Sequence, residues 1–348
     1  MTALVAAQRA PVASPAGPVP VAAVVSGAVR RYRGGRSVGP IDLEVRAGEV
    51  LALMGSNGAG KSTLLRLLAS ADRTDAGRLT WWGEANPRRA RRRLGYAADE
   101  PVEEATLSPR QSTYFWCRQW VSDPGLARRL TGETLESLGL GDRADEPVGS
   151  LSYGLRRRLA LAQALAHRPA LALFDEPSAG LDPDGVAVIT AALRARAQSG
   201  QTTVVASNDP EFVAGVADRV AMLHRGRCLR VAPLQELLAE VPRRRIVQLR
   251  VGDASRDGAG SPTDGAAGRA QRVLTLAVAE RAASLSGVRL VSAADGLVVA
   301  ELEEDAALSH LVAAADSVGS GVLSLEVRRP DLRECFHALV GTEQGEAS

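Results

Sequence analysis

The chain of 348 residues contains little lysine, little cysteine and no long apolar run, and each shortage excludes something. Lysine and arginine together number 42, and Lys61 is the only lysine among them. The three cysteines Cys117, Cys228 and Cys335 lie far apart. That spacing fits neither a disulfide framework nor a closely spaced metal site, and it suggests a reducing compartment. No apolar run approaches the roughly 20 residues that a membrane-spanning helix needs.

Composition sets the broad class. Hydrophobic residues make up 45% and charged residues 24% of the chain, values typical of a globular protein with a sizeable core. The length allows two domains. The net charge of +2 argues against a dedicated nucleic-acid binder, which would carry a strongly basic surface.

The chain divides into three parts. Residues 1–20 are rich in alanine and proline and predict a disordered tail. Residues 21–240 alternate short apolar runs with helical patterns, which is typical of an α/β domain, with a mainly helical part at about 100–165. Continuous apolar runs predict buried parallel strands at 50–54, 170–174 and 203–207, and more alternating segments predict antiparallel edge strands at 43–50 and 77–83.

Residues 241–348 predict a small α+β domain. Its segment 252–268 is rich in Gly, Ser, Asp and Ala and predicts a flexible loop. After the loop we expect strands and helices in an order of ferredoxin-like type. The predicted strands are 272–278, 287–292, 296–302 and 321–327, and the predicted helices are 279–286, 304–315 and 331–340.

A glycine-rich segment between a predicted strand and a predicted helix carries the sharpest signal. It matches the pattern G-x-x-x-x-G-K-[ST], and its members are Gly55, Ser56, Asn57, Gly58, Ala59, Gly60, Lys61, Ser62 and Thr63. Such a loop turns successive N–H groups toward phosphate oxygens, and the helix N-terminus adds its positive dipole end. Lys61 would contact β- and γ-phosphates, and Ser62 would bind Mg²⁺. The alternative is a glycine-rich turn that holds a lysine by chance, which we set aside.

Two acids end the apolar run Leu171–Phe174. Ligands of α/β folds bind at the carboxyl ends of the strands, so Asp175 would hold Mg²⁺ through water and Glu176 would polarise an attacking water. The alternative is an aspartate that simply caps a helix after a strand.

The segment Leu151–Arg158 reads LSYGLRRR and opens a helical run. Ser152 is expected to cap that helix, and Gly154 would let a ligand approach the backbone closely. The exposed N-terminus of a helix is an anion site in its own right.

In order and spacing, these motifs resemble the ATP-binding cassette (ABC) ATPase family, and the resemblance spans roughly 21–240. It implies a P-loop NTPase of ABC type: an α/β fold whose mixed sheet core carries an antiparallel β subdomain and a helical subdomain, followed here by the C-terminal α+β domain. LSYGLRRR is similar to the family's LSGGQ signature. In the family that signature binds the γ-phosphate held by the P-loop of another subunit, so the resemblance implies a dimer around two ATP and Mg²⁺, with Ser152 and Gly154 in a shared site.

Other positions take their expected roles from the same resemblance. Asp182 in SAGLD matches the loop at the dimer seam. Tyr32 lies where the family stacks an aromatic ring on adenine, although it could also be an ordinary edge-strand tyrosine. Trp116 and Trp120 could line the groove for a membrane partner, or could equally belong to the core.

Two positions depart from the family pattern. Where the family has a glutamine, this chain has Asp99 or Glu100, and a carboxylate can reach a metal-bound water but cannot donate as an amide does. Where the family has a switch histidine, this chain has Asn208, which keeps a donor but cannot become positively charged. Removing one preorganised donor can cost ~10²–10³ in rate, so we predict slow ATP hydrolysis by this chain alone.

The resemblance implies the ATP-binding subunit of a transporter on the inner face of the cell membrane, working with an integral membrane permease on another chain. The ending at 329–341, RPDLRECFHALVG, is similar to that of exporters of drugs, lipids and polysaccharides. Homodimer and heterodimer both stay open. The rival hypothesis is an ATP-binding regulator that hydrolyses little. A soluble ABC ATPase of translation or repair fits less well, because one P-loop and no heptad run are present.

Overall fold

The computed structural model describes residues 20–99, 104–240, 245–253, 265–303, 306–318, 320–328, 332–336 and 339. The chain forms two compact units, residues 1–234 and 235–348, so the division falls before the boundary predicted at 240. The predicted tail, apart from Pro20, lies outside the described residues. Among the described helices, none is long and apolar enough to cross a membrane.

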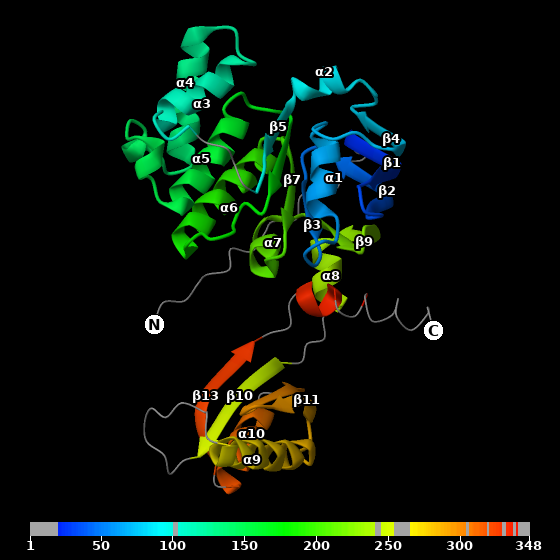
Figure 1. The fold of residues 1–348 in the computed structure, drawn as a ribbon, viewed down its shortest axis with the longest axis vertical. Helices are drawn as coiled ribbons and strands as arrows, with labels where there is room; N and C mark the ends of the chain where they lie inside the picture. The colour runs from blue at the N-terminus through cyan, green and yellow to red at the C-terminus, as the bar shows by residue number, and fades with distance from the viewer. Residues whose placement is uncertain are drawn as a thin grey trace. The chain divides into compact units, whose positions relative to one another are not determined.

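The first unit is built on a six-stranded sheet of order β5-β6-β7-β3-β8-β9 (Figure 1). All neighbours in it run parallel except β8 and β9, which are antiparallel. The strands β3, β6 and β7 are buried along their whole length, as their continuous apolar runs predict. The bounds are β3 Val50–Met54, β5 Leu94–Ala97, β6 Leu171–Asp175, β7 Thr202–Ser207, β8 Arg219–His224 and β9 Arg227–Pro233.

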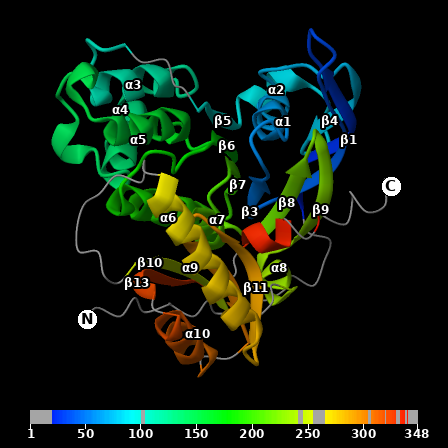
Figure 2. The same ribbon diagram turned by 60° about the horizontal axis from the view of Figure 1, so that its bottom comes forward.

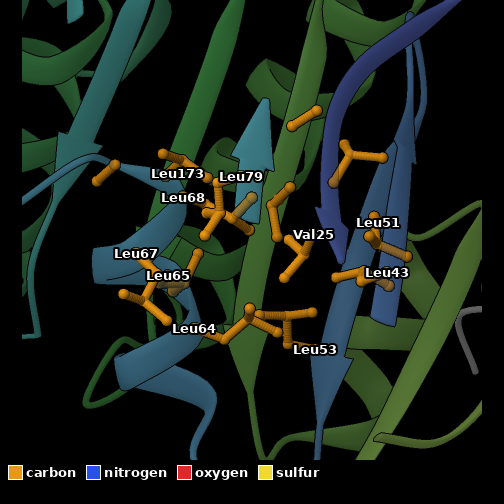
Figure 3. Packing of buried hydrophobic residues seen from close by; sticks show 14 of the residues in the cluster. Val25, Leu43, Leu51, Leu53, Leu64, Leu65, Leu67, Leu68, Leu79 and Leu173 are labelled. Atoms are coloured by element: carbon orange, nitrogen blue, oxygen red, sulfur yellow. The ribbon is translucent and has the colours of Figure 1, made fainter. Parts of the chain in front are cut away.

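A second, antiparallel sheet has the order β2-β1-β4. Its strands are β1 Val21–Arg31, β2 Ser37–Arg46 and β4 Ala76–Trp81. The predicted edge strand 77–83 falls mainly in β4, whereas the predicted segment 43–50 covers only the end of β2 and runs on into the first residue of β3. Helix α1 (Lys61–Leu68) lies between the two sheets, and its leucines share one core with residues of both (Figure 3). Trp81 is part of this core, and its indole Nε1 donates to the Leu68 carbonyl at 2.9 Å.

Helices occupy the stretch predicted to be helical. Ser108 caps α3 and exchanges hydrogen bonds with Gln111, and Asp123 caps α4. The helices of this part are α3 Pro109–Arg118, α4 Pro124–Ser137 and α5 Tyr153–Leu165, with short 3₁₀ turns at Gly141–Arg143 and Val148–Ser150. Elsewhere in the unit α6 (Pro183–Gln198) and α7 (Pro210–Val216) pack on the six-stranded sheet, and α2 (Pro87–Arg91) precedes β5.

The second unit is an antiparallel sheet with helices on one face. Its elements are β10 Arg245–Asp253, α9 Gly265–Ala283, β11 Val288–Ala294, β12 Leu297–Leu302, α10 Ala306–Ser317 and β13 Ser320–Arg328 (Figure 2). The strand order β11-β12-β10-β13 is that of a ferredoxin-like βαββαβ module. Helix α8 (Leu234–Glu240) leads into it, and residues 332–336 of the last predicted helix are helical.

One predicted element of this unit is wrong. Residues 272–278 were expected to form a strand, but they belong to helix α9. The buried positions Thr275, Val278, Ala279 and Ala282 follow the helical spacing. The strand that opens the module is β10, and most of the predicted loop 252–268 lies outside the described residues.

Candidate nucleotide site

The glycine-rich loop joins β3 to α1 and needs its glycines. Gly58 and Gly60 have φ angles of 79° and 103°, in the left-handed region that favours glycine. A side chain at Gly55 would place its Cβ 2.2 Å from the carbonyl oxygen of Leu223, so only glycine fits against β8 there. The loop therefore curls tightly before α1 begins at Lys61.

Lys61 is held inside this loop. Its side chain is 5% exposed. Its Nζ donates to the carbonyl of Gly55 at 2.8 Å and lies 3.6 Å from Oε1 of Glu176. The Lys61 ammonium thus has the Gly55 carbonyl and the Glu176 carboxylate as partners. A bound phosphate would compete with these two groups for the ammonium.

Asp175 ends β6 beside Ser62. Burial raises the pKa of Asp175, and a hydrogen bond with the Ser62 side chain opposes this. Its Oδ1 is buried and has no hydrogen-bond partner among the described residues. A cation would satisfy that oxygen, and Mg²⁺ in phosphoryl-transfer sites is commonly held by one or two carboxylates plus phosphates. Ser62 and Asp175 therefore fit a magnesium ion, although no group of three or more His, Cys, Asp or Glu gathers in the described part of the chain.

Glu176 follows in an unusual backbone conformation. Its φ is 45°, in the left-handed region, which costs a non-glycine residue on the order of 1–3 kcal/mol. Its Oε2 accepts from the backbone N–H of Asn208 at 3.2 Å. Burial raises the pKa of Glu176, with the charge of Lys61 opposing it. A carboxylate with a raised pKa beside a phosphate loop is suited to general-base chemistry.

Two further predicted residues reach the loop from other elements. The hydroxyl of Tyr32 lies 3.0 Å from Oγ1 of Thr63 and accepts from Arg66. The side-chain amide of Asn208 donates to Oδ1 of Asn57 at 3.4 Å. The fold therefore brings Tyr32 and Asn208 to the P-loop, while adenine stacking by Tyr32 stays a prediction.

Three predicted residues have local structural roles. Ser152 caps α5 by accepting from Leu155 N–H, and Asp182 caps α6 by accepting from Gly185 N–H at 2.8 Å. Next to Ser152, a Cβ on Gly154 would lie 3.2 Å from Leu181. Among the described residues, no hydrogen bond joins Ser152, Gly154 or Asp182 to the P-loop.

Asp99 binds a residue that the sequence analysis did not single out. Its Oδ1 accepts from Nη2 of Arg157 at 2.6 Å, and no direct bond to Ser62 or Asp175 is present among the described groups. Glu100, the alternative at this position, lies outside the described residues. A sequence signal for Arg157 existed, because it shares a helix face with the buried Leu161 and Ala164.

Trp116 of α3 and Trp120, in the turn that follows α3, are not core residues. Trp116 and Trp120 are 48% and 43% exposed. They line a groove of about 430 Å³ that also includes Tyr96, Gln163 and His167.

Known proteins are similar to this chain in sequence. A family model described as "ABC transporter" matches residues 38–179. The daunorubicin resistance ATP-binding protein DrrA3 of Streptomyces coeruleorubidus is 32% identical over 93% of this chain and 97% of its own length. The linearmycin resistance ATP-binding protein LnrL of Bacillus subtilis is 26% identical over 86% of this chain and 92% of its length.

A solved structure is similar in fold. The dimeric cassette MJ0796, described as a post-hydrolysis state bound to ADP and Pi, matches with a TM-score of 0.56 and 22% identity, over 61% of this chain and 98% of that one. The chain belongs to the family of ABC transporter ATP-binding proteins. Its fold is that of an ABC ATPase cassette with an added C-terminal unit. As a member of this family it is an ATP-binding ATPase.

Proposed function

We propose that this protein is the ATP-binding subunit of an exporter, in which two cassettes close around two ATP and drive a permease on another chain. The observation that carries the proposal is the buried Lys61 within the P-loop, 3.6 Å from Glu176 and next to Asp175. The match to a daunorubicin resistance protein over both units supports export.

Each residue of the site has a proposed role. Lys61 and the P-loop N–H groups bind the phosphates, and Ser62 and Asp175 hold Mg²⁺. Bound Mg²⁺ would neutralise charge that develops on the phosphoryl oxygens. Glu176 orients and polarises water, and Asn208 donates its side-chain amide to the γ-phosphate after leaving Asn57.

The site is completed by a second cassette in our proposal. Ser152 and Gly154 lie at the exposed start of α5, with no bond to the P-loop of their own chain among the described residues. A helix N-terminus that faces outward can receive the γ-phosphate of a neighbouring subunit. Asp182 would then lie at the seam. The dimeric form described for MJ0796 supports this reading.

The permease would dock in the groove lined by Trp116 and Trp120. Two half-exposed indoles beside apolar helix residues suit an amphipathic helix laid into a groove. A cassette docked in this way belongs at the cytoplasmic face of the membrane.

Hydrolysis by the isolated chain should be slow, because Asn208 cannot carry the positive charge of a histidine. The same observation favours a second candidate function, an ATP-dependent regulator that hydrolyses little. Co-purification with a polytopic membrane protein would favour transport, whereas ATP binding by a chain without a membrane partner would favour the regulator.

The test is the ATPase rate of the purified chain and of Asn208→His. We expect a low parental kcat and a rise of about 10-fold or more in Asn208→His, because a charged donor binds the γ-phosphate more strongly than a neutral amide does. Asn208→Gln is the matched control: it keeps an amide without charge and should stay slow. An ordinary parental rate that collapses in Asn208→Ala would contradict the prediction.

A further inference from the structure

Arg157 is a buried cation at the end of the sheet that carries the site. It lies on α5, and its side chain is 2% exposed. Its Nη2 donates to the carbonyl of Asp175 at 3.0 Å, and its Nε donates to the carbonyl of Glu176 at 3.2 Å. Further bonds from its terminal nitrogens reach the carbonyls of Glu176 and Asp99. One guanidinium therefore binds two successive peptide units of the catalytic segment.

Those bonds bear on the strained residue of the site. The φ of 45° at Glu176 needs support from its surroundings. The Glu176 N–H donates to the Ala206 carbonyl at 2.8 Å, and the Glu176 carbonyl accepts from Arg157. Both sides of the residue are thus fixed, one by the neighbouring strand β7 and the other by α5. The direction of the Glu176 side chain follows from that backbone conformation.

Asp99 supplies the counter-charge. A buried guanidinium is costly without a partner, and the Asp99 carboxylate at 2.6 Å provides one. The Asp99 side chain is itself 54% exposed. Asp99 follows β5, so Arg157 connects α5 with the ends of both β5 and β6.

The neighbouring arginines do something different. Arg156 donates to the Leu151 carbonyl at 3.0 Å, and Arg158 donates to the Leu138 carbonyl at 3.0 Å. Both bonds stay within the helical part of the unit. Arg158 is therefore a matched control for Arg157: the same residue type on the same helix, bound to backbone carbonyls away from Glu176.

We propose that Arg157 is a positioning residue for ATP hydrolysis, which holds the Glu176 backbone in its left-handed conformation while Asp99 keeps the guanidinium in place. The inference rests on the proposed role of Glu176 as the residue that polarises water. In this reading Asp99 acts through Arg157 and is not a ligand of the metal.

The first experiment compares Arg157→Lys with Arg158→Lys. A lysine keeps the charge, but its ammonium cannot bind the two carbonyls in the fixed planar geometry of a guanidinium. We expect kcat to fall about 100-fold in Arg157→Lys, since a displacement near 1 Å can cost that much, while ATP Kd and KM stay within about twofold. Arg158→Lys should leave all three unchanged. An unchanged kcat in Arg157→Lys overturns the proposal.

A double-mutant cycle tests whether Arg157 acts through Glu176. In a Glu176→Gln background, Arg157→Lys should cause no further loss of kcat, because the group that it positions is gone. A full additional loss overturns the proposal. Asp99→Asn, a surface change that leaves the core intact, should lower kcat about 10-fold by the same route.

A readout independent of hydrolysis separates this inference from the proposed function. The backbone N–H of Asn208 donates to Glu176 Oε2, so the hydrogen exchange of this N–H reports the position of the Glu176 carboxylate. We expect several-fold faster exchange at Asn208 in Arg157→Lys and in Glu176→Ala, but not in Arg158→Lys. Unchanged exchange in Arg157→Lys overturns the positioning role. A parent chain that hydrolyses no ATP, but shows this exchange pattern, contradicts the proposed function alone.

Discussion

The two units differ in what they bury. The nucleotide unit buries charged side chains, including Lys61, Asp175, Arg157 and Arg196, and carries a left-handed glutamate. In the described part of the C-terminal unit, Thr275 is the only buried polar side chain, and it accepts from the backbone N–H of Gly296 at 3.1 Å. The core of the C-terminal unit is otherwise aliphatic.

This difference separates two uses of a protein interior. Buried charge is costly, so a unit that keeps it gives up stability for a preorganised site. The aliphatic core of the C-terminal unit has no such conflict. We therefore expect substitutions in the nucleotide unit to exchange stability against activity, and substitutions in the C-terminal core to change stability alone.

The sharpest test is Lys61→Arg. A planar guanidinium cannot replace the slim ammonium inside the closed P-loop, so ATP affinity should fall about 1,000-fold, or ~4 kcal/mol. The measurement is titration with a fluorescent ATP analogue. Arg66→Lys on the same helix is the control and should keep affinity within a few-fold. Unchanged affinity in Lys61→Arg would refute our account of the lysine.

The next test concerns the C-terminal core. Leu249 is fully buried there, so Leu249→Ala should cost about 2–5 kcal/mol of the free energy of unfolding of that unit. Calorimetry of the full chain should show the loss in one transition, with ATP affinity unchanged. Leu51→Ala in the nucleotide unit should by contrast impair both stability and ATP binding. Equal effects of the two changes on ATP binding would break the comparison.

The smallest effect, and the most informative in sign, is expected from Asp175→Asn. Removing the ionised form of a buried carboxylate should stabilise the nucleotide-free protein by ~1 kcal/mol, or about 2–4 °C in Tm, while ATP hydrolysis is lost. Adding Mg²⁺ and ATP should reverse the order of the two Tm values, because the parent gains more from the ligand.

The stabilisation by Asp175→Asn should depend on pH in a defined direction. Burial raises the folded-state pKa of Asp175 above the ordinary 3.8. Between pH 3.8 and the folded-state pKa, the folded chain holds a proton on Asp175 that the unfolded chain has lost. The stability of the parent therefore falls as pH rises through this window. The advantage of Asp175→Asn should be full above the folded-state pKa of Asp175 and should vanish toward pH 3.8. An advantage that grows in acid would contradict the assignment.

Sequence predicted the parts of the fold where one local rule dominates. The short, continuous apolar runs correctly predicted β3, β6 and β7 as fully buried strands, and the P-loop pattern predicted the turn before α1. Helix α9 was misread because Val273 and Leu276 are apolar but exposed. Their alternation with buried neighbours masked the helical spacing of Thr275, Val278 and Ala282.

The sequence predicted the residues of the site, but not the residue that holds their backbone in place. Motif spacing identified Lys61, Asp175 and Glu176, whose proximity the structure shows. Arg157 stands between two similar arginines; its helix face indicates burial, but only the packing of α5 against the end of β6 shows that it binds the Asp175 carbonyl. The left-handed backbone of Glu176 has no sequence signal, since residue type alone would disfavour it.

The position of α1 between two sheets has a consequence for how this protein can change over generations. Leu64, Leu65, Leu67 and Leu68 are all buried, so the helix that begins at the P-loop belongs to the core of both sheets. Substitution of these leucines would disturb the P-loop and the stability of the unit together, so the two traits are inherited together at these positions. Independent adjustment of affinity is left to residues outside this core, such as Ser62, Asn57 and Asn208.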